Sequence, residues 1–282
     1  MSPRQTLKKL LQRGKLLVAP GCFDGLSARL VEEAGFEAAY LSGGAVARSM
    51  GIPDIGLVTM SEAIERAAQV VSAIKIPIIA DADTGYGNAV NLVRTVREFE
   101  RIGVAAIHIE DQITPKRCGH LDGKEVVSLP EIEQKLAAAL ATRTDPDFCI
   151  IARTDARGVN GFDDAIERAR AFAKLGVDAI FFEAPQSEEE LAEIPRRLPG
   201  VPLLVNVFKG GKTPMLPMER LGIDCDDRVD RGAAFVVGLD AVQVGLHQLP
   251  ASQLAGFVRR VNLFDGGLND VETHKSSSRL EG

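Results

Sequence analysis

The sequence predicts an α/β fold and, within that class, a single-domain (β/α)8 TIM barrel. Eight short apolar runs recur along the 282 residues, and amphipathic, helix-like stretches lie between them. Near-continuous apolar runs are typical of parallel strands that are buried on both faces. A barrel of about 250 residues fits a chain of this length. The alternative is an open doubly wound sheet, but residues 20–25, after the first run, lack the expected GxGxxG fingerprint.

The expected strands are the apolar runs themselves. In chain order they are Leu16–Pro20, Ala38–Leu41, Pro77–Ala80, Ala105–Ile109, Phe148–Ala152, Ala179–Phe182, Pro202–Val205 and the weaker run Ala233–Val237. We expect the barrel domain, with a C-terminal helical extension, to span residues 1–272. Residues 273–282 have the polar composition of a disordered tail.

Capping residues predict where several helices begin and end. Ser61 is expected to cap one helix, and acidic Asp163 and Asp164 open another. Ser187 with Glu190 three residues later forms the pattern of a capping box. The glycines expected to end helices in the left-handed conformation are Gly35, Gly103 and Gly176.

Composition excludes several classes of protein. The chain has 33 basic and 39 acidic residues, a net charge of −6, and no basic block, so nucleic acid is not an expected partner. Four scattered cysteines form no zinc-type pair and no disulfide framework. The N-terminus has no apolar signal segment, and no run approaches the length of a membrane span. We therefore expect a cytoplasmic enzyme that acts on a small molecule.

Two carboxylates close the third expected strand. Asp81 and Asp83 share one face and follow a fully apolar stretch. Two buried carboxylates repel each other unless a cation or a proton lies between them, and oxygen ligands favour Mg²⁺ or Mn²⁺. The alternative is that one acid simply caps the next helix. On the fourth strand, Glu110 is a natural further ligand, while His108 is interpreted as a satisfied core histidine.

Polar side chains also close the other strands, where a barrel places its active site. Tyr40 and Ser42 share a face, and the Gly43-Gly44 pair after them leaves backbone N–H groups open to an anion or forms only a tight turn. Arg153 needs an anionic partner at its expected depth. Glu183 and Asn206 close the sixth and seventh strands.

The pentapeptide Lys116–His120 (KRCGH) is the most informative motif. Cys118 stands beside two cations and close to a histidine, which favours a lowered thiol pKa and proton transfer. Pro115, Gly119 and Gly123 predict a loop over the site rather than a helix or strand. The alternative is a basic surface loop with an incidental thiol.

Together these motifs resemble the isocitrate lyase / phosphoenolpyruvate mutase superfamily, from about residue 10 to about residue 222. The matching segments are SGG at 42–44, DADTGYGN at 81–88, IED at 109–111, KRCGH at 116–120, IARTDA at 151–156 and GGKTP at 210–214. The cysteine in KRCGH resembles the carbon–carbon lyase branch, with 2,3-dimethylmalate lyase, petal death protein and 2-methylisocitrate lyase as members. The resemblance implies a Mg²⁺-dependent lyase, with Mn²⁺ as a substitute, that splits a 2-hydroxy di- or tricarboxylate into a 2-oxo acid such as pyruvate and a carboxylate such as propionate or succinate.

The resemblance also implies roles for individual residues. Cys118 would be the general acid, assisted by Lys116, His120 and Arg153. The implied metal ligands are Asp81 and Asp83, with Asp54 and Glu110 in support. The implied substrate-binding residues are Tyr40, Ser42, Gly43, Gly44, Arg117, Gly119, Arg153, Glu183, Asn206 and Thr213. Relatives of this kind are usually homotetramers, in which a C-terminal helix is often exchanged between subunits.

Two departures leave alternatives open. Lys209 stands where the dimethylmalate branch usually carries a glutamate, and residues 223–246 do not resemble the usual eighth strand and following helix. The substrate expectation leans modestly toward a 2-alkylmalate over methylisocitrate. Oxaloacetate hydrolase or decarboxylase chemistry, phosphonate chemistry of the carboxyphosphonoenolpyruvate mutase type, and a degenerate paralogue that binds small acids or serves as an assembly subunit are the other hypotheses.

Overall fold

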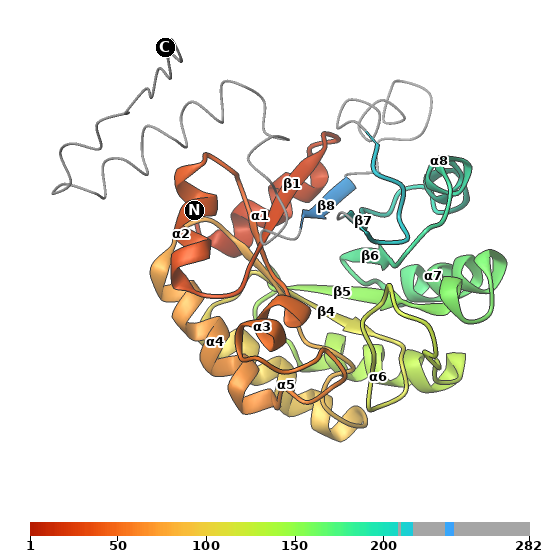
Figure 1. The fold of residues 1–282 in the computed structure, drawn as a ribbon, viewed down its shortest axis with the longest axis horizontal. Coiled ribbons are helices and arrows are strands. Elements are labelled where there is room, and N and C mark those ends of the chain that lie inside the picture. The colour runs from red at the N-terminus through yellow and green to blue at the C-terminus, as the bar shows by residue number, and fades with distance from the viewer. Residues whose placement is uncertain (208–209, 217–234, 240–282) are drawn as a thin grey trace, which may run out of the picture.

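The computed structural model describes residues 1–207, 210–216 and 235–239, the last of these by their backbone. Helices surround a curled sheet of parallel strands (Figure 1). The strands are β1 (Leu17–Cys22), β2 (Ala39–Leu41), β3 (Ile78–Asp81), β4 (Ala106–Glu110), β5 (Cys149–Thr154), β6 (Ala179–Phe182), β7 (Leu203–Val207) and β8 (Phe235–Leu239). The helices are α1 (Pro3–Gln12), α2 (Gly25–Glu33), α3 (Gly43–Ser49), α4 (Met60–Ala73), α5 (Ala89–Ile102), α6 (Leu129–Thr142), α7 (Phe162–Leu175) and α8 (Glu188–Arg197), with a short 3₁₀ turn at Ala156–Gly158.

All eight expected strands are present, and each pairs in parallel with the next along the chain. β8 also pairs with β1, so the hydrogen-bonded order closes on itself. The prediction of an α/β fold built on a parallel sheet is therefore confirmed. The helices expected after β7 and β8, the exchanged helix and the tail from 273 lie outside the described residues.

Two apolar layers hold the sheet. The inner layer consists of inward-facing side chains of the strands, such as Ile79, Ile151 and Phe181. Leu7, Leu10 and Leu11 of α1 belong to the same buried layer. The outer layer packs the helices against the other face of the strands and includes the fully buried Phe99, Phe148, Phe172 and Phe182. Each such side chain contributes about 1.5–3 kcal/mol through removal of its surface from water.

The helix caps agree with the sequence except at Ser61 and in one half of the predicted box at Ser187, where the Glu190 carboxylate accepts the N–H of Gln186. Ser187 accepts the N–H of Glu190 at the start of α8, and Gly103 and Gly176 end α5 and α7 with left-handed backbone. The prediction that Ser61 caps α4 is wrong, because Thr59 is the cap and forms a capping box with Glu62. Both threonine and serine can cap, and Thr59 has the acid at the third helical position that the box requires.

Among the described residues, no helix is both long enough and apolar enough to cross a lipid bilayer.

Candidate active site

The carboxyl ends of the strands bring the expected polar side chains into one cleft. Alternation places Asp81, His108, Glu110 and Arg153 on the inward face, and strand register sets Asp81 beside His108 and Glu110 beside Arg153. The cleft is lined by Tyr40, Ser42, Gly44, Arg48, Asp54, Asp81, Lys116, Cys118, Gly119, His120, Arg153, Glu183 and Asn206. An adjoining pocket that shares Asp54 and Asp81 adds Gly43 and Asp83 to this lining.

On one side of the cleft lies what we call the aspartate cluster, formed by Asp54, Asp81, Asp83 and Lys116. The Lys116 Nζ lies 2.5 Å from Asp54 Oδ1 and 2.9 Å from Asp83 Oδ1. Burial raises the pKa of Asp83 to about 6, although Lys116 acts against that rise. Asp83 also has left-handed backbone, with φ of 46°, which is strained for a residue other than glycine. Charge repulsion and strain are thus concentrated at this cluster.

The donor set of this region fits a hard divalent cation. Asp83 Oδ1 and both Glu110 carboxylate oxygens are buried, with Lys116 Nζ 2.9 Å from Asp83 Oδ1 and Arg153 Nε 3.3 Å from Glu110 Oε2. Buried carboxylates that lie close together are stabilised by a cation, and oxygen ligands favour Mg²⁺ or Mn²⁺. In the described part of the chain, however, no three carboxylate, His or Cys side chains converge as a metal site. A lysine ammonium stands between Asp54 and Asp83 instead.

The segment Ser42-Gly43-Gly44 is neither a tight turn nor an open anion cradle. Ser42 caps α3 and accepts the N–H of Ala45, and the N–H of Gly43 donates to Asp81 Oδ2 at 3.1 Å. A Cβ on Gly43 would lie only 2.6 Å from the Asp81 carboxylate. Glycine at 43 therefore allows the helix start to approach Asp81, and the prediction that its N–H is open to a ligand is wrong.

His108 is more than a satisfied core residue. It is fully buried, its Nε2 forms a 2.7 Å hydrogen bond with the Tyr40 hydroxyl, and it lies 3.6 Å from Asp81 Oδ1. Burial lowers its pKa to about 4, which keeps the ring neutral. Its Nδ1 has no hydrogen-bond partner among the described residues. His108 thus orients the hydroxyl of Tyr40, which lines the cleft.

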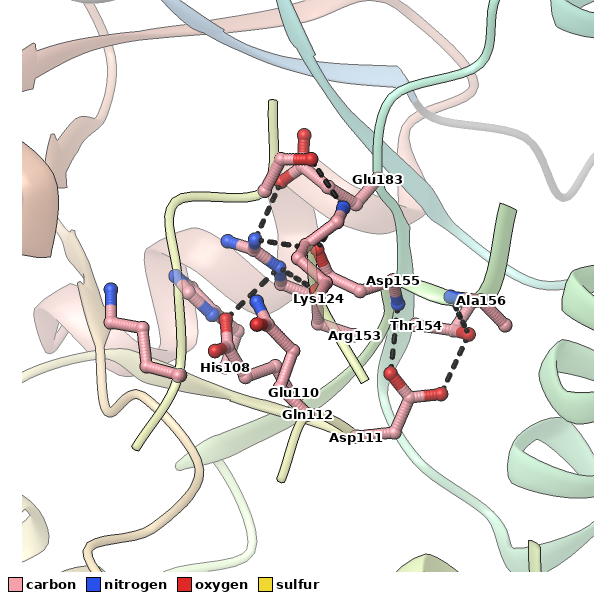
Figure 2. Close-up of polar contacts among 12 residues, drawn as sticks. His108, Glu110, Asp111, Gln112, Lys124, Arg153, Thr154, Asp155, Ala156 and Glu183 are labelled. Carbon is pink, nitrogen blue, oxygen red and sulfur yellow. Dashed lines mark hydrogen bonds and ion pairs between the residues drawn. The ribbon is translucent and has the colours of Figure 1, made fainter. Parts of the chain in front are cut away.

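On the other side of the cleft lies what we call the arginine cluster, formed by Glu110, Arg153, Asp155 and Glu183 (Figure 2). Arg153 Nε lies 2.8 Å from Asp155 Oδ2 and 3.3 Å from Glu110 Oε2, and its Nη2 lies 3.1 Å from Glu183 Oε2. The guanidinium also stacks 4.9 Å from the centre of the Phe181 ring. The prediction that Arg153 needs an anionic partner is confirmed, and three acids supply it.

Cys118 lies in the loop between β4 and α6, where KRCGH forms neither helix nor strand, as expected. The prediction of a lowered thiol pKa is wrong: burial is the largest influence and raises it, Asp54 and Glu183 raise it further, and Arg153 and a backbone N–H oppose the rise only in part. Lys116 faces Asp54 and Asp83 rather than the sulfur. A protonated thiol is what a proton donor requires.

The neighbours of Cys118 differ in where they point. Gly119 passes so close to Arg153 and Glu183 that any Cβ there would collide with both. His120 Nε2 lies 2.8 Å from Glu183 Oε1, and its Nδ1 accepts the N–H of Lys212. Arg117, by contrast, is exposed and is absent from the described lining of the cleft.

The predictions for the three remaining positions have different outcomes. Asn206 lines the cleft. Thr213 is buried but lies outside the described lining, and its hydroxyl has no hydrogen-bond partner in the described chain. The prediction based on Lys209 lies outside the described residues.

Sequence reasoning missed three residues of the site. Asp155 pairs with Arg153, Lys124 joins Asp155 from the loop, and Arg48 of α3 lines the cleft. Asp155 follows Arg153 by two residues, so its place on the same strand face was the available signal. Lys124 and Arg48 lie in segments without a periodic pattern, and only their contacts reveal them.

Comparison with known proteins identifies the family to which the chain belongs. The family model described as "Phosphoenolpyruvate phosphomutase" matches residues 7–229. The chain is 48% identical over 226 residues to 2,3-dimethylmalate lyase from Eubacterium barkeri, which covers 79% of this chain and 78% of that protein. It is 46% identical over 218 residues to 2-methylisocitrate lyase from Aeropyrum pernix, covering 77% and 70% of the two chains.

Solved structures give the same grouping. A structure of oxaloacetate acetylhydrolase with the inhibitor 3,3-difluorooxalacetate superposes with a TM-score of 0.77 at 34% identity, covering 94% of this chain and 86% of that one. A structure of 2,3-dimethylmalate lyase, titled as a PEP mutase/isocitrate lyase superfamily member, gives 0.77 at 32%, covering 97% and 88%. Phosphonopyruvate hydrolase in complex with oxalate and Mg²⁺ gives 0.75 at 30%, covering 94% and 87%.

Proposed function

This chain belongs to the phosphoenolpyruvate phosphomutase family, and from that premise we propose that it is a carbon–carbon lyase. The proposed reaction cleaves a 2-hydroxy di- or tricarboxylate, such as 2,3-dimethylmalate or 2-methylisocitrate, into a 2-oxo acid, such as pyruvate, and a carboxylate. The observation that carries the proposal is a half-buried Cys118, whose thiol pKa is raised by burial, on a loop that lines the same cleft as Arg153. The two relatives reported above carry lyase names.

Residues of the chain can donate and accept the protons, and stabilise the negative charge, that this cleavage involves. When the bond between the hydroxyl carbon and its neighbour breaks, the electron pair stays on the leaving carbon as an enolate of the carboxylate. Cys118 Sγ donates the proton that quenches this carbanion. The hydroxyl proton passes to a carboxylate of the cleft, where Asp54 and Asp81 are available. Arg153 stabilises developing negative charge from a fixed position, without reorganisation.

The oxo-acid half is proposed to lie against Tyr40, Ser42 and Gly44, since these line the cleft beside Arg153. Gly43 supports this wall through its hydrogen bond to Asp81. Gly119 and His120 place the leaving carboxylate on the loop side, with Glu183 and Asn206 opposite. Arg117 and Thr213 remain proposed contacts only for a longer substrate, because neither lines the described cleft.

Mg²⁺, with Mn²⁺ as a substitute, is the proposed cofactor. Asp81, Asp83, Asp54 and Glu110 would hold it, because they are carboxylates with oxygen ligands, and burial and mutual repulsion raise the pKa of Asp83 and of Glu110. When bound, the ion would supply Lewis-acid stabilisation of the negative charge on the oxo-acid side. A solved relative contains oxalate and Mg²⁺, which supports this assignment.

Charge pairing favours a 2-alkylmalate over methylisocitrate. A third substrate carboxylate requires an additional cation, since an unpaired buried charge costs several kcal/mol. Lys116 is already engaged by two acids and Arg153 by three, and Arg48, which also lines the cleft, is not without a partner. Lys212 pairs with Asp122 at 2.6 Å. We therefore propose a dicarboxylate substrate and expect isocitrate to be poor.

Hydrolysis of oxaloacetate is the second candidate, because oxaloacetate acetylhydrolase is among the structural neighbours. That reaction would use the same carboxylate cleft. Phosphonate chemistry is a weaker hypothesis, since Cys118 has no role in it. A degenerate paralogue that only binds small acids or serves in assembly is also a weaker hypothesis, since it would not need a proton donor in the cleft.

The assembly is also a proposal. We propose that the chain forms one (β/α)8 domain and that the protein is a cytoplasmic homotetramer. The predictions of a C-terminal extension up to residue 272, an exchanged helix and a tail at 273–282 lie outside the described residues.

The test is incubation of the purified protein and Mg²⁺ with 2,3-dimethylmalate, citramalate, methylisocitrate, isocitrate and oxaloacetate, with detection of pyruvate, glyoxylate and oxalate. We expect pyruvate from the alkylmalates with the highest kcat/KM. Oxalate from oxaloacetate alone would replace lyase with hydrolase activity. A higher kcat/KM for methylisocitrate would reverse the substrate preference, and no turnover of any acid would favour the degenerate paralogue.

A further inference from the structure

A buried lysine on the Cys118 loop has no place in the reaction described above. Lys124 follows Cys118 by six residues, and only 2% of its side chain is exposed. An ammonium group removed from water is strongly destabilising unless it is paired and hydrogen-bonded. Its burial therefore requires specific partners.

Lys124 has two polar partners, one on the barrel and one on its own loop. Its Nζ lies 2.8 Å from Asp155 Oδ1, and it also donates to the carbonyl oxygen of Gly119. Figure 2 shows Lys124 and Asp155 facing each other beside Arg153. The backbone at Gly158 leaves room for the ammonium, since a Cβ there would lie 3.2 Å from Nζ.

The barrel partner is the same carboxylate that holds Arg153. Asp155 is fully buried and accepts from Arg153 Nε at 2.8 Å and from Nη2 at 3.2 Å. Without Lys124, one guanidinium would face three carboxylates, namely Asp155, Glu110 and Glu183. Lys124 brings a second cation to this arginine cluster, and it does so from the loop.

The loop partner adjoins the proton donor. Gly119 follows Cys118, and its backbone passes in contact distance of Arg153 and Glu183. Because the Lys124 ammonium donates to the Gly119 carbonyl oxygen, it holds in place the peptide next to Cys118. The peptide on the other side of Cys118 is held separately, because the Cys118 N–H donates to the carbonyl oxygen of Asp54 at 3.2 Å.

We propose that Lys124 is a positioning residue that holds Cys118 over the cleft by linking the Gly119 carbonyl to Asp155. Because Asp155 also holds Arg153, the lysine ties the proton donor on the loop to the charged group on the barrel. The inference rests on the proposed role of Cys118, but the link itself is a property of the substrate-free protein.

The main experiment measures thiol accessibility without substrate. Wild type and Lys124→Met are treated with iodoacetamide, and modification of each cysteine is followed by peptide mass spectrometry. We expect the Cys118 rate to rise about 10- to 100-fold in Lys124→Met, the range for losing a hydrogen bond to a charged group. Buried Cys22 and Cys149 are internal controls and should keep their wild-type rates.

A matched variant tests the same loop without touching the link. Asp122→Asn removes the exposed ion pair between Asp122 and Lys212, and it should leave Cys118 labelling near wild type. Lys124→Arg, which keeps the positive charge, should restore part of the protection. An equal rise at Cys22, Cys149 and Cys118 would mean general unfolding and would overturn the positioning role, as would a Lys124→Met rate equal to that of Asp122→Asn.

Kinetics on the best substrate provide the second readout. In Lys124→Met, kcat should fall about 10- to 100-fold while KM changes about threefold or less, because the loop is misplaced but the oxo-acid side of the cleft is intact. A normal kcat together with faster labelling would also overturn the proposal. If wild type turns over no acid in the panel, the labelling result still decides the link, so failure of the proposed function and failure of this inference are distinguishable.

Discussion

The aspartate cluster and the arginine cluster occupy the same end of the barrel, yet their charges are balanced differently. Arg153 meets a carboxylate in each of three directions, and Lys124 adds a second cation. In the aspartate cluster, Lys116 is the cation within ion-pair distance of Asp54 and Asp83 among the described residues. The pKa of Asp155 is lowered by Arg153 and Lys124 despite its burial, whereas burial raises that of Asp83 to about 6.

The difference indicates separate tasks for the two clusters. In the arginine cluster, Arg153 and Lys124 of the polypeptide itself pair with the acids, so the charged groups are held in place before substrate arrives. The aspartate cluster has excess buried negative charge, which a cation from solution can neutralise. Cys118 lies between them, with Asp54 and Glu183 raising its pKa and Arg153 lowering it.

Metal removal should give the largest effect. EDTA should reduce turnover below detection, and Mg²⁺ or Mn²⁺ should restore it, because the aspartate cluster lacks a sufficient cation of its own. Steady-state rates before and after readdition are the measurement. Circular dichroism should show an unchanged fold in EDTA, since the two apolar layers that hold the sheet do not depend on an ion. Full activity in metal-free buffer would break the contrast between the clusters.

Replacement of the proton donor should be the next largest effect. Cys118→Ser should lower kcat by about 10²–10⁴-fold, the range for general acid catalysis, while substrate affinity survives. Single-turnover kinetics and equilibrium binding separate the two quantities. Cys22→Ser is a matched control because that thiol is buried away from the cleft. A Cys118→Ser kcat within a few-fold of wild type would make the thiol incidental.

Matched amide substitutions in the two clusters should differ in stability. Asp155→Asn should lower the free energy of unfolding by about 3–5 kcal/mol, because it leaves Arg153 and Lys124 without their shared acid. Asp83→Asn in metal-free buffer at pH 7 should instead raise it by roughly 1–3 kcal/mol, since it removes a buried carboxylate whose pKa is raised to about 6, while Lys116 keeps Asp54. Urea unfolding of both variants provides the values. Equal losses in the free energy of unfolding would show that the charges of the aspartate cluster are also balanced within the polypeptide.

The smallest expected effect is on the pH dependence of stability. The pKa of Asp83 is raised from its ordinary 3.8 to about 6, so the folded state binds this proton more tightly than the unfolded state. Metal-free stability should therefore fall as pH rises from about 4 to about 6, by roughly 1–3 kcal/mol from this group. Asp155 acts oppositely, since its lowered pKa gives stability that is lost on acidification below its ordinary range.

Urea unfolding across this pH range, with and without Mg²⁺, measures the slope. Asp83→Asn should reduce, but not abolish, the fall in the free energy of unfolding as pH rises. Part of that fall remains because the pKa values of Asp111 and Glu110 are also raised in the folded state. Mg²⁺ should stabilise wild type more at pH 7 than at pH 5. Stability that rises from pH 4 to 6 in metal-free wild type would contradict the sign assigned to Asp83.

The sequence by itself determined the strand pattern and the inward positions. Alternation along buried strands is local, so Asp81, Glu110 and Arg153 could be placed on one face without the structure. The KRCGH motif likewise identified the loop that lines the cleft. Each of these predictions depends on near neighbours in the chain.

Only the tertiary structure decided which charges meet. Lys116 contacts Asp54 across 62 residues, and Lys124 contacts Asp155 across 31. The sequence placed two cations beside Cys118 and so predicted a lowered thiol pKa, but Lys116 is directed to the aspartates and Arg117 is exposed. Burial then became the largest influence and raised the pKa instead. Electrostatic effects depend on distance and dielectric environment, and folding sets both.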